Sequence, residues 1–415
     1  MSTGLGDTRI RWTSFPVLLL AVAALAGWAP FAARAGEAGP TIKIISSLPR
    51  TGASKGESDG IVNGINMALS EANNQAGGFT IVYEDLDDAT AARGSWDADK
   101  EITNATTAID DPQVMAYIGT VDSGAAALSI PLLCQADVAM VSTSNTYPGL
   151  TKPDAFDPGE PGKYYPDGCA RNFVRLIPPD DLQGPAGAEW ARSLNAQRVY
   201  VLNDGGKYGA GISSTFAVAA KQKGLDLVGG PETIDPAASD YRALAEEISL
   251  ALPDFIYYGG TAQGSVGRLW QDLKAEIPDA KLMAPDALLE QSFIQLAGSA
   301  AEGTYITFGG VPPQQLAGSG AAWYTRYRAD FHTDPEAYSI YGYEAANVIL
   351  AAINRVGTAD RAAIRDAIVD TSDFDGVLGV WSFDADGDTT LVNFSGRQVR
   401  NGQFDDANAV SILGY

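Results

Sequence analysis

The chain has 415 residues, of which 46% are hydrophobic, enough for two or three domains that each bury a core. Its net charge of −23 disfavours binding to nucleic acid or to anionic membranes, because both need cationic side chains to neutralise phosphate. The single histidine, His332, lies where a helix is expected to end, which argues against a Ser-His-Asp triad or a histidine-based metal site. We therefore predict no enzyme, no metal and no cofactor.

The first 35 residues have the features of a secretory signal peptide. Arg9 and Arg11 precede the apolar run 15–26, and Ala33 and Ala35 supply the small residues that a signal peptidase recognises. The apolar run is shorter than the roughly 20 residues that a membrane-spanning helix needs. We predict cleavage near Ala35 and an exported protein, periplasmic or secreted.

After this leader, short apolar runs alternate with amphipathic helical stretches, a pattern typical of doubly wound α/β folds with parallel sheets. Strands of a first unit are expected at residues 41–48, 79–85, 114–118 and 138–141. An extended segment, 172–179, leads to a second unit with strands expected at 199–202, 225–228, 255–258, 281–284 and 304–308. The chain closes with helices around 323–331, 345–356 and 362–369 and with strands at 379–383 and 390–394.

A β-α-β unit over residues 114–151 offers a candidate site. Its loops 120–124 and 142–146 would lie side by side at the carboxyl ends of adjacent strands, where open α/β sheets bind ligands. Ser123 precedes a helix that Pro131 is expected to interrupt, and Ser144 and Thr146 add hydroxyl groups, so the loops suit a small anion such as a carboxylate. The same residues are equally compatible with helix caps and turns.

The two cysteines after the leader, Cys134 and Cys169, predict a disulfide in an oxidising compartment, with two unpaired thiols as the alternative. The bond would close a ring of about 35 residues and stabilise the fold by roughly 3 to 4 kcal/mol on the chain-entropy model. It would also tether the polar loop 152–168 beside the candidate site.

Seven segments in this order carry a resemblance to a known family: 117–119, 123–126, 142–146, 175–184, 207–211, 254–260 and 300–303. Together they resemble the leucine/isoleucine/valine-binding family of type I periplasmic binding proteins, the substrate-binding proteins of branched-chain amino acid ABC transporters. The resemblance covers essentially all of the chain after the leader.

The resemblance implies two Rossmann-like doubly wound lobes joined by three crossovers, near 176–179, 308–311 and within 391–399. Lobe 1 is expected to comprise 41–177 and 312–390, and lobe 2 to comprise 178–311 and 391–415. A small-molecule solute, by this resemblance an amino acid, would bind between the lobes as they close about a hinge. The partners implied are the membrane subunits of an ABC permease, and the protein itself is expected to be a monomer.

The resemblance also assigns roles to residues. It implies that Ser123, Ser144 and Thr146 bind the carboxylate of the ligand, in agreement with the candidate loops. Tyr208 matches the aromatic residue of the second lobe, and Asp286 matches the acid that binds the ligand ammonium, although Asp286 could equally be a helix cap.

Two departures from the family pattern predict a more polar pocket than one for leucine. Thr261 begins a segment where an aromatic pair and an acid are usual, and Lys55 lies near the place of an apolar aromatic residue. Together with Asp122 of the first loop, these residues complete the expected site. We expect an amino acid with a polar or acidic side chain, met by Lys55 or Arg50, with a solvated loop lysine as the alternative.

The same fold could serve a second function. A ligand-sensing receptor for an amino acid, an amide or a related solute would act with a separate membrane signalling partner. Loss of uptake on deletion of the cognate permease would favour transport, whereas loss of only a transcriptional or chemotactic response would favour sensing.

Overall fold

Two mostly parallel sheets with matching strand orders organise the chain. The computed structural model describes Arg9 and residues 39–153 and 157–412, and residues 39–415 form one compact unit. The expected signal peptide, apart from Arg9, lies outside the described residues.

The first sheet has the strand order β2-β3-β1-β6-β7-β8. Its strands are β1 (Thr41–Leu48), β2 (Gln75–Ala76), β3 (Phe79–Asp87), β6 (Val114–Gly119), β7 (Ala139–Ser142) and β8 (Phe173–Arg175). All pairings are parallel except that of β2 with β3. The helices between these strands are α1 (Lys55–Glu71), α2 (Ala98–Asp110) and α3 (Ser123–Gln135). A small hairpin, β4 (Ala89–Thr90) and β5 (Ser95–Trp96), precedes α2. Every residue of β6 and β7 is buried, as expected for central strands covered by helices on both faces.

The second sheet has the strand order β10-β9-β11-β12-β13-β16-β17, with β18 also paired to β16. Its strands are β9 (Arg198–Asn203), β10 (Asp226–Thr233), β11 (Phe255–Gly259), β12 (Lys281–Ala284), β13 (Tyr305–Gly309), β16 (Phe394–Arg400), β17 (Gln403–Phe404) and β18 (Val410–Ile412). The helices of this half are α4 (Asp180–Ser193), α5 (Lys207–Gln222), α6 (Arg242–Leu250), α7 (Val266–Glu276) and α8 (Gln291–Ala297). In both sheets the first parallel strand lies between the second and the third, so each sheet has a switch point beside it.

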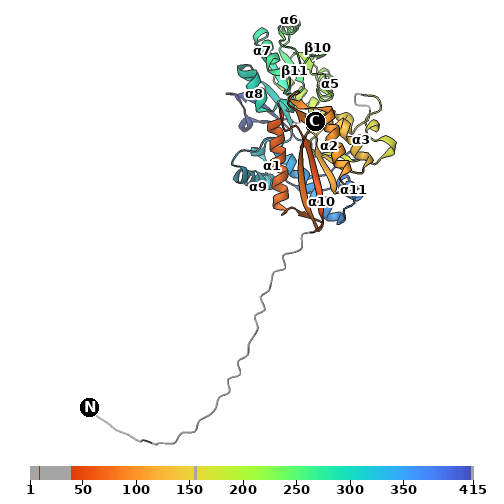
Figure 1. Cartoon of the computed structure of the whole chain (residues 1–415). Helices are drawn as coiled ribbons and strands as arrows, with labels where there is room; N and C mark the ends of the chain where they lie inside the picture. Colours follow the sequence, from red (N-terminus) through yellow and green to blue (C-terminus); the bar gives the residue numbers. More distant parts are fainter. Residues whose placement is uncertain (1–8, 10–38, 154–156, 413–415) are drawn as a thin grey trace, which may run out of the picture. The chain divides into compact units, whose positions relative to one another are not determined.

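The chain passes between the sheets three times, after β8, after β13 and before β16. Between the last two passages it returns to the first sheet and forms α9 (Gly318–Phe331), α10 (Ser339–Val356), α11 (Arg361–Val369) and a hairpin of β14 (Phe374–Gly376) with β15 (Gly379–Trp381). Helices α10 and α11 pack against α1 and against β6 and β7, whereas α5 to α8 gather around the second sheet (Figure 1). The predicted fold of two doubly wound α/β lobes with three crossovers is confirmed.

Helices α1 and α10 cross at two glycines. A Cβ atom on Gly64 would lie 2.0 Å from the carbonyl oxygen of Ser339, and one on Gly342 would lie 2.2 Å from that of Ile61. Only residues without side chains allow the two backbones to come this close. The contact packs the first turn of α10 against the second and third turns of α1.

Two local predictions are wrong. Helix α3 runs through Pro131 without a break, because the buried residues on either side, Ile130 and Leu133, hold it against the sheet at the cost of one backbone hydrogen bond. The strand expected at 390–394 instead begins at Phe394, because residues 394–398 are the ones that pair with β13. The segment 172–179, expected to be extended, contains β8, which pairs parallel with β7 before the chain crosses to the second sheet.

Among the described residues, no helix is both long enough and apolar enough to span a lipid bilayer.

Candidate functional site

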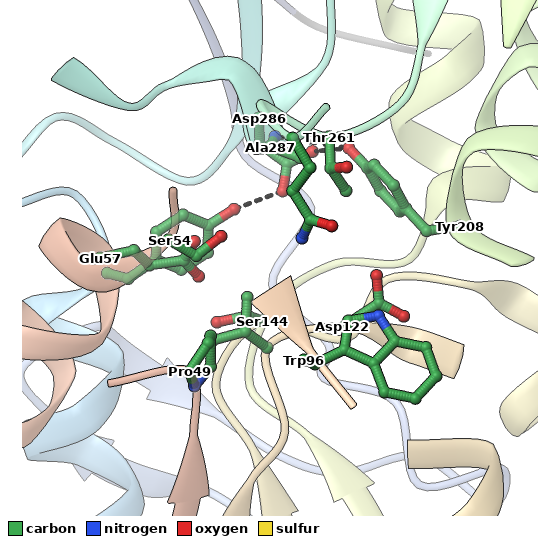
Figure 2. A pocket seen from close by; sticks show the side chains of 13 residues that line it. Pro49, Ser54, Glu57, Trp96, Asp122, Ser144, Tyr208, Thr261, Asp286 and Ala287 are labelled. Atoms are coloured by element: carbon green, nitrogen blue, oxygen red, sulfur yellow. Dashed lines mark hydrogen bonds between the residues drawn. The ribbon is translucent and has the colours of Figure 1, made fainter. Parts of the chain in front are cut away.

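A pocket lies where the carboxyl ends of both sheets face each other. From the first half of the chain it is lined by residues that follow β1, β6 and β7, and from the second half by residues that follow β9, β11 and β12 (Figure 2). About 440 Å³ of space, part of it open to solvent, lies among its lining residues. Its lining residues are Pro49, Ser54, Glu57, Trp96, Val121, Asp122, Ser144, Tyr208, Thr261, Gln263, Asp286, Ala287 and Tyr338.

Asp286 begins the short helical turn after β12 and is held by three donors. Its Oδ1 accepts hydrogen bonds from the Tyr208 hydroxyl at 2.7 Å and from Gln183 Nε2 at 2.8 Å, and its Oδ2 accepts one from the Tyr338 hydroxyl. Burial raises the pKa of Asp286, and the three hydrogen bonds act against that rise. Tyr338 leads into α10, which packs against the first sheet, and Asp286 follows β12 of the second sheet. Their contact therefore links the two sheets across the pocket.

Glu57 enters the pocket from the first turn of α1. The residue is only 7% exposed, and its Oε1 has no hydrogen-bond partner. Burial raises the pKa of Glu57 to about 8, the Ser144 hydroxyl favours the charged form, and the charges of Asp286 and Glu336 oppose it. The backbone N–H of Glu57 donates to Glu290 Oε1 at 3.2 Å, a contact that also spans the two halves.

Asp122 is the N-cap of α3. Its Oδ1 accepts the Gly124 N–H at 2.6 Å, and burial raises its pKa to about 6 although hydrogen bonds from Gly124, Ala125 and Trp96 favour the charge. Trp96, from the β4–β5 hairpin, lies beside it in the wall of the pocket (Figure 2). The carboxylate of Asp122 therefore occupies the helix N-terminus that was expected to receive an anion from the ligand.

Five of the residues predicted for the site line this pocket: Asp122, Ser144, Tyr208, Thr261 and Asp286.

Three other predicted site residues are not among its lining. Ser123 is buried, and its Oγ accepts the N–H of Tyr147 at 3.3 Å. The hydroxyl of Thr146 is buried without a hydrogen-bond partner, and it lies near enough to Asp180 to favour the charged form of that carboxyl, whose pKa burial raises. Lys55 is the first residue of α1, where its ammonium pairs with Asp59 and about half of the side chain is exposed.

Arg50, the other cation expected to meet an acidic ligand, is also engaged elsewhere. It pairs with Asp59 at 3.0 Å and with Asp85 at 2.9 Å. Among the described residues that line the pocket there is no lysine, arginine or histidine. Neither Arg50 nor Lys55 is therefore placed to meet an acidic side chain in this conformation.

Sequence reasoning missed Glu57, Trp96 and Tyr338. Glu57 had a usable signal, because it precedes Ile61 and Ile65 by four and eight residues and so shares their buried face of α1. Tyr338 and Trp96 had none, since they lie far along the chain from the strands whose ends they cover.

The structure joins Cys134 and Cys169 in a disulfide with a Cα–Cα distance of 5.9 Å. The loop that it tethers carries Glu160, which accepts hydrogen bonds from the hydroxyls of Tyr147 at 2.7 Å and Tyr164 at 2.6 Å. Lys207, at the start of α5, donates to Glu160 at 3.1 Å and to Asp157 at 3.0 Å. The tethered loop therefore makes an ion pair with the second half of the chain.

Comparisons with known proteins agree with this architecture. A family model for periplasmic binding proteins matches residues 41–403. The Leu/Ile/Val-binding protein BraC3 of Rhizobium johnstonii is 28% identical over 361 residues, which cover 86% of this chain and 90% of that protein. The crystal structure of the leucine binding protein LivK from Thermotoga maritima has a TM-score of 0.76 at 25% identity and covers 88% of this chain and 97% of its own.

A second solved structure, the branched-chain amino acid transporter substrate binding protein LivJ from Streptococcus pneumoniae in complex with isoleucine, has a TM-score of 0.75 at 23% identity. It covers 90% of this chain and 99% of its own. This chain has a pocket between the strand ends of two α/β units, which is the arrangement of two-lobed solute-binding proteins. This chain belongs to the periplasmic binding protein family, as a type I member of its branched-chain amino acid group.

Proposed function

We propose that this protein is the extracytoplasmic solute-binding subunit of an ABC importer and that it holds an amino acid or a related amine in the pocket between its lobes. The observation that carries the proposal is the shared lining, because residues from both sheets converge on one buried, polar cavity. In this proposal the lobes are 41–177 with 312–390 and 178–311 with 391–415. The protein is exported, is cleaved near Ala35, acts as a monomer and delivers its solute to a membrane permease.

The mechanism that we propose is closure about the three crossovers. Contacts such as that between Asp286 and Tyr338 bridge the lobes only when the cleft is shut, so a solute that binds both walls favours the closed population. Asp286 is the acid that binds the amino group of the solute, and the Ser144 hydroxyl is available for a hydrogen bond to the solute.

Relatives differ in what they bind. The LivJ structure holds isoleucine, whereas a solute binding protein from Rhodopseudomonas palustris with a TM-score of 0.71 and 19% identity holds benzoate. The pocket of this chain contains Glu57, Asp122 and Asp286 and favours a solute with an amino group over an anionic one. The expected ligand therefore has a polar side chain that is not acidic.

The test uses the exported protein, unfolded and refolded to remove any solute retained during purification. A thermal-shift screen against amino acids and small amines should raise the melting temperature for one class of solute. X-ray scattering with the same solute at saturation should give a smaller radius of gyration. A raised melting temperature with an unchanged radius of gyration would contradict hinge closure, and no shift with any of these solutes would contradict the proposed function.

A further inference from the structure

Glu57 has a carboxylate for which the folded chain provides no counter-charge. It lines the pocket, it is more than nine-tenths buried, and its Oε1 has no hydrogen-bond partner. A buried carboxylate in this state costs stability unless a donor or a cation reaches it. The pocket is the open space next to it, so a bound solute is the natural source of that partner.

The charges around the pocket favour a cation strongly. Glu57, Asp122 and Asp286 line it from three separate elements. In addition to burial, the negative charge of Glu336 raises the pKa of Glu57, and the charge of Glu57 in turn raises that of Glu290. The neighbouring cations are committed to other acids, Arg50 and Lys55 to Asp59 and Lys207 to Glu160. Carboxylates gathered in one poorly solvated site cannot all ionise without positive charge from elsewhere.

Places that could receive an anion are already filled by carboxylates of the chain. At the N-terminus of α1 the amide of Glu57 donates to Glu290, and at that of α3 the amide of Gly124 donates to Asp122. Just before α5, the amide of Gly206 donates to Asp204 Oδ1 at 2.9 Å. A carboxylate on the solute would therefore find few free donors, whereas positive groups would also meet the aromatic side chains of Trp96, Tyr208 and Tyr338.

We propose that the pocket selects a small solute with two positively charged groups on a short chain, one bound by Asp286 and the other by Glu57. Diamines and amino acids with a basic side chain share this chemistry. The proposal rests on the proposed binding function, and it adds Glu57 as the residue that determines specificity.

Calorimetry with matched pairs of solutes tests the proposal. L-lysine is compared with L-norleucine, which lacks only the terminal amino group, and putrescine is compared with butylamine in the same way. We expect at least one dication to bind about 30-fold more tightly than its singly aminated partner, as for one added charge-assisted hydrogen bond. Binding only of the lysine pair would identify a basic amino acid, and binding only of the putrescine pair would identify a diamine.

The variant Glu57→Gln separates this role from a structural one. It should weaken binding of the preferred dication about 30-fold and change binding of its partner less than about threefold. The matched control is Glu71→Gln, the same substitution at the last residue of α1, which pairs with Arg326 and is not part of the pocket lining. It should leave both affinities within about threefold.

A second measurement does not depend on the variant. At neutral pH, binding of the dication should release protons into the buffer, which calorimetry in buffers of different ionisation enthalpy detects, and Glu57→Gln should reduce that release.

Each outcome separates the two proposals. If norleucine or leucine binds as tightly as lysine and closes the lobes, the dication proposal is wrong and the binding function stands. If Glu57→Gln weakens both members of a pair equally, Glu57 does not determine specificity, and the binding function again stands. If none of these solutes binds but another solute of the thermal-shift screen does, the dication proposal is wrong and the binding function stands; if no solute of that screen binds either, both proposals fail.

Discussion

The two walls of the pocket use their buried acids differently. On the second-sheet side, Asp286 receives hydrogen bonds from Gln183, Tyr208 and Tyr338, so its position is fixed before any solute arrives. On the first-sheet side, Glu57 has an oxygen without a donor. One acid is therefore preorganised by the fold, whereas the other depends on the solute for its partner.

The strongest test of this contrast is Asp286→Asn. An asparagine keeps one carbonyl oxygen for Tyr208 and Gln183, and its amide N–H can donate to the Tyr338 hydroxyl, which then acts as the acceptor. The charge is removed while the contacts remain possible, so the free energy of unfolding should change by less than about 1 kcal/mol. The affinity for an amine solute should nevertheless fall about 100-fold, because the charge-assisted contact is lost. Chemical denaturation and calorimetry measure the two effects. An affinity loss below about tenfold would show that Asp286 only supports the wall.

The second test concerns the ligand-free protein and pH. The pKa of Glu57 is about 8 in the folded chain and near its ordinary value of 4.5 in the unfolded chain, so the folded state binds more protons between these values. The free energy of unfolding should therefore fall as pH rises from about 4.5 to about 8, by at most roughly 1.4 kcal/mol per pH unit for this one group.

Glu57→Gln should flatten that slope. Ser144, Asp286, Glu290 and Glu336 face the same carboxylate and remain in the variant, so the difference between the two slopes reports the ionisation of Glu57 together with its effect on the ionisation of Glu290. Urea denaturation at several pH values gives both slopes. Parallel slopes would mean that Glu57 is already ionised in the free protein and would weaken the contrast between the walls.

A smaller effect is expected from the ion pair that joins the walls at their rim. Lys207→Ala removes the contacts to Asp157 and Glu160, and partly exposed ion pairs contribute about 0.2 to 1 kcal/mol. The variant should weaken solute binding by no more than about fivefold and should weaken it less in high salt. Calorimetry at two ionic strengths provides the check, and a loss greater than about 20-fold would place the main energetic contact at the rim.

The smallest effect is expected from Lys55→Ala. Lys55 pairs with Asp59 on the surface of α1 and is not among the pocket lining, so the affinity measured by calorimetry should change by less than about twofold. A tenfold loss in solute affinity would restore Lys55 as a ligand-binding residue.

The sequence predicted the fold well because strands and helices leave local patterns. The runs at 41–48 and 114–118 are apolar enough to indicate buried parallel strands, and β1 and β6 lie there. The loops after these strands also led to Asp122 and Ser144, since the carboxyl ends of neighbouring parallel strands meet at one edge.

The rest of the site depends on contacts that no local pattern encodes. Tyr338 reaches Asp286 only because the chain returns from β13 to the first sheet and begins α10 there. Ser123 and Thr146 do not line the pocket in this conformation, because the Ser123 hydroxyl accepts the N–H of Tyr147 and the Thr146 hydroxyl is buried beside Asp180. The polarity of the pocket could be predicted, but its sign could not, since Lys55 and Arg50 pair outside it.

The crossing of α1 and α10 has a consequence for how the protein can change over evolution. Glu57 and Tyr338 stand at the beginnings of these two helices, and the separation of the helices is set by Gly64 and Gly342. A methyl group at either glycine would force the helices apart and would move Glu57 away from Tyr338. A substitution at Gly64 or Gly342 would therefore change the spacing of two residues that line the pocket without exchanging either of them.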